Sequence, residues 1–328
     1  MHKYIFVFIT GFILSASLML ALRSISIKYK ILNFKGVSLF GGLGLALSML
    51  ISLVLASFVF NLCFLKEFIL IKVGFIMLAF GILDDMKEMS VINKVFIQSL
   101  CAALLIALGI KTDIIYIGLI GNIVVTYLWI IGITNAFNLL DIMDGLASGV
   151  ALIVSGAFLV IAILNSNLNM GIFIVALCAA ILGFIIFNLS ARKLYLGNSG
   201  SNFLGLLISA IALTLHFAPL ERKLALFTPI IILWLPIIDT LLLIILRVKK
   251  GMVPYIKSDD HVALKIFALG FSHKKTIVFM FFLCFSFALA GLILSRVNDL
   301  IAIGIIFLVL LSTAILFYKL LKIDNEIK

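Results

Sequence analysis

Long apolar segments recur along nearly the whole chain, and they restrict the possible folds more than any other feature. They lie at about residues 4–22, 38–63, 68–83, 95–110, 119–138, 146–165, 171–189, 201–216, 225–246, 276–295 and 299–318. Most approach the roughly 20 residues that a helix needs to cross a hydrocarbon core of about 30 Å. Because the backbone cannot leave its polar groups unpaired in lipid, we expect these segments to be helices. The sequence thus predicts an all-α, polytopic integral membrane protein with about 11 transmembrane helices.

Composition supports a single membrane domain. Apolar residues make up 65% of the 328 positions and charged residues 12%, whereas soluble domains carry about 25% charged residues. No polar block or linker rich in Pro, Gly and Ser divides the chain, so we expect one transmembrane domain over residues 1–328. The four cysteines form no CxxC pair and no cluster with histidine, so we expect neither disulfides nor a cysteine-bound metal.

The distribution of basic residues predicts the orientation in the membrane. Only Lys3 precedes the first apolar segment, whereas Arg23, Lys28, Lys30 and Lys35 follow it, which favours a retained helix over a signal peptide. Because cytoplasmic loops carry an excess of Lys and Arg, we expect the N-terminus outside and the C-terminus in the cytoplasm. The net charge of +11 fits either this topological role or a basic face for phosphate-bearing partners, and we expect the bilayer but no nucleic acid as a partner.

With this orientation the polar stretches gather on one side of the membrane. Four of them, residues 84–94, 135–147, 188–202 and 247–275, are expected to form cytoplasmic loops. The loops on the outer side are short and carry few polar residues. We therefore expect the chemistry of the chain at the cytoplasmic face.

Asp84 and Asp85 form the first candidate cluster, within Gly81-Ile-Leu-Asp-Asp-Met-Lys-Glu-Met-Ser90. Two adjacent carboxylates at a membrane boundary repel each other and require a cation, a donor or water. They are either solvated acids at a helix end or part of a Mg²⁺ or phosphate site, since hard cations take carboxylate oxygens.

A second cluster follows the segment 119–138. Asn135, Asn138 and Asp141 are spaced by three residues, so they share one face of a helix, and Asp144 continues this line if the helix persists. Such a polar stripe is costly in lipid unless it faces a polar cavity. Hydrogen bonding between helices is the alternative role.

Residues 197–205 open an apolar segment with glycine, serine and asparagine. Small residues at the start of a helix leave backbone N–H groups free, and these groups suit an anion together with the positive end of the helix dipole. Close packing between helices explains the same glycines equally well.

The last cluster lies in and after the segment 225–246. Asp239 lies within the apolar run and needs a partner, for which Arg247 is a candidate. His261 follows Asp259 and Asp260, and a histidine beside acids can titrate near neutral pH. A solvated loop histidine is the alternative.

Taken in order, these motifs resemble the polyprenyl-phosphate N-acetylhexosamine-1-phosphate transferases, a family that includes undecaprenyl-phosphate GlcNAc-1-phosphate transferase and phospho-N-acetylmuramoyl-pentapeptide transferase. The resemblance extends from about Gly81 to His261. It implies transfer of an aminosugar 1-phosphate from a UDP-aminosugar to polyprenyl (undecaprenyl) phosphate, with release of UMP. It further implies a Mg²⁺ cofactor (with Mn²⁺ as a substitute), a homodimer, and an active site at the cytoplasmic face of the bacterial inner membrane, where envelope polysaccharide synthesis begins.

The resemblance also implies roles for individual residues. The matches to catalytic positions are Asp84, Asp85, Asp141, Asp144 and His261. The matches to substrate-binding positions are Lys94, Asn135, Asn138 and Asn188, to which we add Arg247 because cations of its loop can attract the nucleotide. The matches to metal ligands are Asn138 and Asn198.

The sequence departs from the family's pattern at three places. Asn198, in Gly197-Asn-Ser-Gly-Ser201, stands where relatives carry a metal-binding aspartate; its amide oxygen can still bind Mg²⁺ but lacks the negative charge. Ile142 replaces a glycine, and His261 is followed by Val-Ala-Leu264 instead of further histidines. The missing histidines favour a small aminosugar over a muramoyl-pentapeptide as the substrate.

Two other functions stay open from the sequence. Asn198 and the shortened histidine motif fit a weak or inactive relative that binds lipid phosphate or nucleotide without turnover. Asp141, Asp144 and Asp239 would instead serve an ion-coupled transporter. Such sites usually lie mid-bilayer in broken helices of repeated halves, and the chain has no evident internal repeat.

Overall fold

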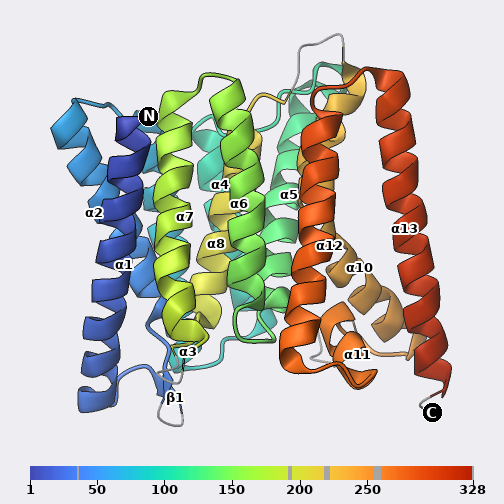
Figure 1. Cartoon of the computed structure of the whole chain (residues 1–328), viewed down its shortest axis with the longest axis horizontal. Coiled ribbons are helices and arrows are strands. Elements are labelled where there is room, and N and C mark those ends of the chain that lie inside the picture. Colours follow the sequence, from blue (N-terminus) through green and yellow to red (C-terminus); the bar gives the residue numbers. More distant parts are fainter. Residues whose placement is uncertain (35–36, 191–193, 218–221, 254–259, 327–328) are drawn as a thin grey trace. The chain divides into compact units, whose positions relative to one another are not determined.

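The computed structural model describes the chain except residues 35–36, 191–193, 218–221, 254–259 and 327–328 (Figure 1). The described residues are helical apart from turns, connecting loops and one short hairpin. The chain divides into two compact units, Met1–Leu215 and His216–Lys328, and each is described by itself.

The first unit holds eight α-helices, a two-stranded hairpin and a short 3₁₀ helix among its described residues. Its elements are α1 (His2–Tyr29), β1 (Asn33–Phe34), β2 (Val37–Ser38), α2 (Gly41–Phe60), α3 (Leu65–Met86), α4 (Val91–Ala107), η1 (Ile115–Ile117), α5 (Gly118–Leu140), α6 (Leu146–Leu164), α7 (Leu168–Asn188) and α8 (Gly197–Thr214). The hairpin is antiparallel and pairs Asn33 with Ser38. A further hydrogen bond joins the hairpin to the segment before α8, where the Tyr195 N–H donates to the Ser38 carbonyl over 2.9 Å.

Helices α7 and α8 form the core of this unit. Helix α8 packs against α2, α3, α5 and α6, and α7 packs against α1, α2 and α6. Figure 1 shows α1, α7 and α6 running side by side. Small residues allow the close approach that holds helices together in lipid. A β-carbon on Gly205 of α8 would lie 2.7 Å from the Thr134 Cα of α5, so a larger side chain has no room there.

The second unit is built around α12. Its elements are η2 (Lys223–Phe227), α9 (Thr228–Ile232), α10 (Trp234–Lys249), α11 (Val262–Ala268), α12 (His273–Leu294) and α13 (Asp299–Glu326). Helix α12 contacts α9, α10, α11 and α13. A β-carbon on Gly291 of α12 would lie 2.5 Å from the Ile232 side chain, so the two helices meet closely at this point.

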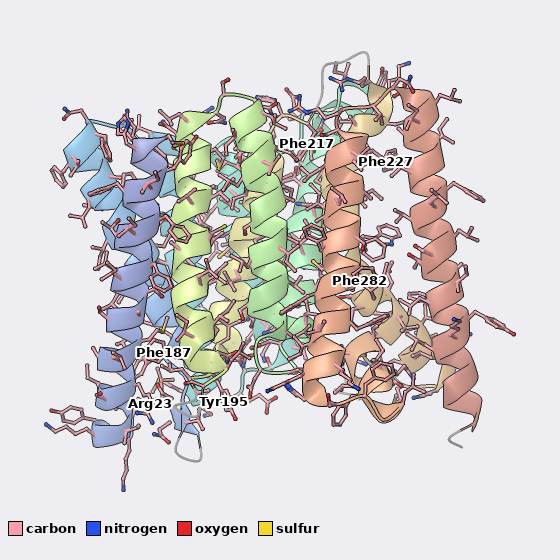
Figure 2. The ribbon with its side chains drawn as sticks, in the orientation of Figure 1. Arg23, Phe187, Tyr195, Phe217, Phe227 and Phe282 are labelled. Carbon is pink, nitrogen blue, oxygen red and sulfur yellow. The ribbon has the colours of Figure 1, made fainter. Side chains whose placement is uncertain are left out.

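The long helices confirm an all-α, multi-pass membrane protein. By length and composition seven helices of the described chain can cross a membrane: His2–Tyr29, Gly41–Phe60, Ile115–Leu140, Leu146–Leu164, Leu168–Asn188, His273–Leu294 and Asp299–Leu321. Figure 2 shows mainly carbon side chains along the outer faces, and Phe282 of α12 is 64% exposed. Helices α3, α4 and α8 occupy predicted segments but do not meet the same criterion. Eleven spans are therefore not confirmed, and the orientation of the termini stays a prediction.

The predicted segment 225–246 is not one straight helix. Lys223–Ile232 and Trp234–Lys249 meet at a bend of 72° and together make an eighth possible span. Pro236 explains the break, because it has no N–H for the Ile232 carbonyl and its ring crowds that carbonyl. The sequence placed the apolar run correctly, but the effect of the proline was missed.

Candidate functional site

The end of α3 places a carboxylate against a lysine of the next helix. Helix α3 ends at Met86 and α4 begins at Val91, so only a short turn separates Asp84 from Lys94. The Lys94 Nζ lies 2.7 Å from the Asp84 Oδ2, and the other carboxylate oxygen accepts the Met89 N–H over 2.7 Å. The Asp84 side chain is 5% exposed and that of Lys94 is 30% exposed. Asp84 is thus a buried carboxylate fixed by an ion pair, and Lys94 is the residue of this pair that a ligand can reach.

Asp85 bridges α3 to the beginning of α8. Its Oδ1 accepts the Asn198 N–H over 2.7 Å and its Oδ2 accepts the Ser199 N–H over 3.0 Å. A carboxylate at a helix N-terminus is favoured by the free N–H groups and by the helix dipole. Free N–H groups for an anion were one of the two explanations offered for this loop, and for these two groups it is wrong because Asp85 already occupies them.

Glycines bring three backbone segments together at this point. A β-carbon on Gly81 would lie 2.3 Å from the Ser199 Cα, and one on Gly42 would lie 2.4 Å from the Gly200 nitrogen. Gly197 has φ of +72°, which side chains of other residues disfavour. The glycines of this loop therefore have a packing and a conformational reason, independent of any ligand.

Asn138 joins α5 to the same loop. Its Nδ2 donates to the Asn198 Oδ1 and to the Ser201 Oγ, each over 3.0 Å. Within the part of the chain that the structure describes, its Oδ1 has no hydrogen-bond partner. The two residues predicted as metal ligands, Asn138 and Asn198, are therefore neighbours, and one of their two amide oxygens already accepts a hydrogen bond.

Asn135 lies one turn away and binds a residue that sequence analysis missed. Its Nδ2 donates to the Gln98 Oε1 over 2.8 Å, and the Gln98 Nε2 donates back over 3.2 Å. The same Nε2 reaches the Asn202 Oδ1 at 3.4 Å. Gln98 is 4% exposed and lies within the apolar run of α4, and an amide in such a place requires partners. Asn135 therefore links α4 and α5, the helix-to-helix role that was left open.

Asp141 and Asp144 lie in the turn between α5 and α6. Helix α5 ends at Leu140, so Asp144 does not continue the helical stripe. The turn closes at Gly145, whose φ is +83°. Burial, with further contributions from Asp85 and Asp144, raises the pKa of Asp141 to about 7. The carboxylates at this end of the unit are thus close enough to disfavour one another's ionisation.

Asn188 holds the segment that leads into α8. It is the last residue of α7, is 4% exposed, and its Nδ2 donates to the Leu194 carbonyl over 2.8 Å. Arg192 and Lys193, within the predicted cytoplasmic loop 188–202, lie outside the described residues. The contact assigns Asn188 a role in shaping the loop.

Arg247 and His261 belong to the second unit. We expected Arg247 to pair with Asp239, and this is wrong. The Asp239 Oδ2 lies 2.8 Å from the His261 Nδ1, and its Oδ1 accepts the Val262 N–H over 2.8 Å. Arg247 is 2% exposed on α10. His261 is thus not a solvated loop histidine, because it is 3% exposed and bound to a buried carboxylate.

The acid directly before His261, which the sequence analysis named without assigning it a role, is also buried. Asp260 is 4% exposed and binds the Lys250 Nζ, while the Lys265 Nζ lies 3.7 Å from it. Asp259, named with it in the sequence analysis, lies outside the described residues. The sequence shows Lys250 and Lys265 near Asp260, but it does not show that they pair with it, because that depends on the tertiary fold.

The structure therefore gathers nine of the predicted residues in the first unit. They are Asp84, Asp85, Lys94, Asn135, Asn138, Asp141, Asp144, Asn188 and Asn198, and they lie at the ends of α3, α5 and α7 and the beginnings of α4 and α8. Figure 2 labels Tyr195, which precedes α8, at this same end of the unit.

Comparison with known proteins identifies the family. The model of "Glycosyl transferase family 4" matches residues 68–216, which include all nine residues of the first unit. A probable undecaprenyl-phosphate N-acetylglucosaminyl 1-phosphate transferase of Bacillus subtilis is 31% identical over 258 residues, covering 75% of this chain and 71% of that protein.

Two other relatives match over shorter parts. A decaprenyl-phosphate N-acetylglucosaminephosphotransferase of Mycolicibacterium smegmatis is 27% identical over 237 residues, 63% of this chain and 58% of that protein. A phospho-N-acetylmuramoyl-pentapeptide-transferase of Levilactobacillus brevis is 40% identical over 89 residues, 27% of this chain and 28% of that protein. The family that the motifs resembled is confirmed: this chain is a membrane-embedded member of glycosyl transferase family 4.

Proposed function

We propose that this chain transfers N-acetylhexosamine-1-phosphate from a UDP-aminosugar to polyprenyl phosphate and releases UMP. One observation carries the proposal: a reachable lysine, Lys94, is held by a buried aspartate beside a loop that Asp85 fixes. This arrangement lies inside the region that matches the family. Relatives named as polyprenyl-phosphate N-acetylglucosamine-1-phosphate transferases support the reaction class.

Lys94 suits the phosphate of the lipid substrate. Its ammonium has three donors, and the described ion pair with Asp84 uses only one direction. Asp84 is held by Lys94 and by the Met89 N–H, so it orients the lysine more readily than it acts as a free base. Because a phosphate monoester is largely ionised near neutral pH, the acceptor oxygen is already a nucleophile, and the main task is to position it.

A divalent cation, Mg²⁺ or Mn²⁺, fits the acids and amides at this end of the unit. Asp141 and Asp144 would hold it, with the amide oxygen of Asn138 or Asn198. The pKa of Asp141 is raised mainly by burial and further by the negative charges of Asp85 and Asp144, which a cation would offset. The described residues contain no cluster of three His, Cys, Asp or Glu side chains placed to bind a metal. Mg²⁺ commonly takes one or two carboxylates and fills its shell with substrate phosphates and water, so the proposal needs no larger cluster. Bound there, it would neutralise the diphosphate and the departing UMP.

The remaining predicted groups, Arg247 and His261, belong to the second unit, and their roles are proposed from the sequence and the resemblance alone. Arg247 would attract the nucleotide, and His261 would act at the phosphates, as the resemblance implies. The proposed setting is the cytoplasmic face of the bacterial inner membrane, where the product would start an envelope polysaccharide. A homodimer is part of the same proposal.

The reaction is tested by UMP release from purified protein in lipid nanodiscs. Polyprenyl phosphate is combined with a panel of UDP-N-acetylhexosamines, with Mg²⁺, Mn²⁺ or a chelator. We expect release only when lipid, one donor and metal are all present. Asp84→Asn should abolish it, while Asp113→Asn should not, because Asp113 is 96% exposed on another loop. Wild-type turnover retained in Asp84→Asn would contradict the proposal.

A second candidate is a protein that binds the substrates without turnover. The contact between Asn138 Nδ2 and Asn198 Oδ1 supports it, because Asn198 is a neutral amide and offers a cation no negative charge. The two functions differ in one result. If wild type binds radiolabelled polyprenyl phosphate but releases no UMP, and Asn198→Asp gains release, the natural protein is a binder.

A further inference from the structure

We propose that Asp239 is a positioning residue that fixes the ring orientation and the tautomer of His261. Asp239 lies on α10, 22 positions before the histidine and outside residues 68–216 that match the family model. The part of the inference that concerns catalysis rests on the proposed function. The part that concerns the ring does not.

The contact between the two residues is buried, and both carboxylate oxygens of Asp239 have a hydrogen-bond partner. The Asp239 side chain is 1% exposed and that of His261 is 4% exposed. One carboxylate oxygen lies 2.8 Å from the His261 Nδ1, and the other accepts the Val262 N–H over 2.8 Å. Because both oxygens are bound, the carboxylate cannot rotate without losing a hydrogen bond to a buried group, which is unfavourable.

The chemistry of the pair selects one form of the ring. An ionised carboxylate only accepts hydrogen bonds, so the Nδ1 of a neutral His261 must carry the proton. The Nε2 is then the nitrogen with a lone pair, and it has no hydrogen-bond partner among the residues that the structure describes. A ring flip would turn a C–H group toward Asp239, so the carboxylate also fixes which nitrogen faces away. Carboxylates orient histidines in this way in many catalytic sites.

The neighbouring charges have partners of their own. Asp260, directly before His261, binds Lys250 and lies near Lys265. This acid and Asp239 are therefore bound by different groups: basic side chains that include Lys250 and Lys265 for one, an imidazole and a backbone N–H for the other. The presented Nε2 can thus take up a proton through its lone pair when the ring is neutral, and it donates to a phosphate oxygen of a substrate once it is protonated.

A purely structural role is the competing explanation. In it, Asp239 only anchors the start of α11 through the Val262 N–H. Asp239→Asn distinguishes the positioning role from the purely structural role, because an asparagine keeps the size and one accepting oxygen but places an NH₂ group opposite the imidazole. That group donates, so the neutral ring must accept at Nδ1 and carry its proton on Nε2.

The experiment is ¹⁵N NMR of histidine-labelled full-length protein in nanodiscs, with UMP release measured on the same samples. The chain has four histidines, and His261→Gln identifies the resonance of interest. We expect wild type to carry the Nδ1–H form and Asp239→Asn to carry the Nε2–H form. We expect kcat to fall about 10- to 100-fold in this variant, with the KM for the UDP-aminosugar changed less than about threefold.

Three results would overturn the inference: an Nε2–H wild type, an unchanged tautomer in Asp239→Asn, or an Asp239→Asn enzyme with wild-type kcat. The wild-type spectrum decides the first of these even if the variant does not fold. A wild type that releases no UMP with any donor would instead overturn the proposed function, and the two spectra would still decide whether Asp239 sets the tautomer.

Discussion

Gly81 of α3 lies against the backbone of Ser199, so close that a β-carbon on the glycine would be 2.3 Å from the Ser199 Cα. The next helical turn of α3 carries Asp84 and Asp85, and Ser199 is one of the two residues whose N–H groups bind Asp85. The spacing between these helices therefore sets the geometry of the carboxylate and the loop together.

Gly81→Ala should displace the start of α8 and weaken both hydrogen bonds to Asp85. We expect UMP release to fall at least tenfold and the melting temperature to drop, since overpacking typically costs about 1–3 kcal/mol. Gly132→Ala is the matched control, because nothing lies within 4 Å of a β-carbon at that position in α5. Equal activity of the two variants would show that the close approach does not matter for the site.

Lys94→Gln should act mainly on the lipid substrate. The change removes the cation that faces Asp84 and that a phosphate can reach. We expect the KM for polyprenyl phosphate to rise at least tenfold while the KM for the UDP-aminosugar changes little. Lys111→Gln serves as the control, because that lysine lies 4.0 Å from an exposed aspartate and away from the site. A rise in the KM for the nucleotide sugar alone would contradict the assignment.

The raised pKa of Asp141 predicts how stability depends on pH. The folded protein binds the proton of the Asp141 carboxyl more tightly than the unfolded chain, whose aspartates titrate at about pH 4. The resulting stabilisation is fully present below the unfolded pKa and is lost as pH rises through about 7. We expect Asp141→Asn to reduce the fall in melting temperature between about pH 5 and pH 8.

The same measurement with metal tests the cation site. Ionised Asp141 should bind Mg²⁺ better than the protonated form. Mg²⁺ should therefore raise the wild-type melting temperature more at about pH 8 than at about pH 5. Asp141→Asn should lose this difference, and Asp113→Asn should keep it. A Mg²⁺ effect that is the same at both pH values would remove Asp141 from the site.

Much of this architecture follows from composition and motif order. The apolar runs predicted helices at nearly every observed position, because length and hydrophobicity alone decide what can cross lipid. The break at Leu233 was missed, since a run of apolar residues does not show how a proline redirects its helix. Asp85 was singled out as a candidate beside Asp84, but its two hydrogen bonds to the glycine loop depend on how α3 and α8 approach, which no spacing reveals.

Pairings across the fold were the least predictable part of the site. Asp239 needed a partner by its charge, yet the nearer Arg247 was chosen over His261 because sequence distance was the only guide. Gln98 gave a weaker signal, a single amide in an apolar run, and its partners on α5 and α8 could not be named before the helices were packed.

Gln98→Leu tests how far this amide network supports the site. The change leaves Asn135 without its reciprocal partner and Asn202 without a donor, and unpaired buried polar groups cost about 1–3 kcal/mol each. We expect a lower melting temperature and a fall in kcat, because the Asn202 Nδ2 binds the Asn198 carbonyl over 2.7 Å and transmits the change to the loop. Asn135→Leu added to Gln98→Leu should recover part of the stability, since it removes one orphaned amide. If the double variant is instead less stable than Gln98→Leu by the full cost of Asn135→Leu alone, the two side chains act independently and the network has no energetic meaning.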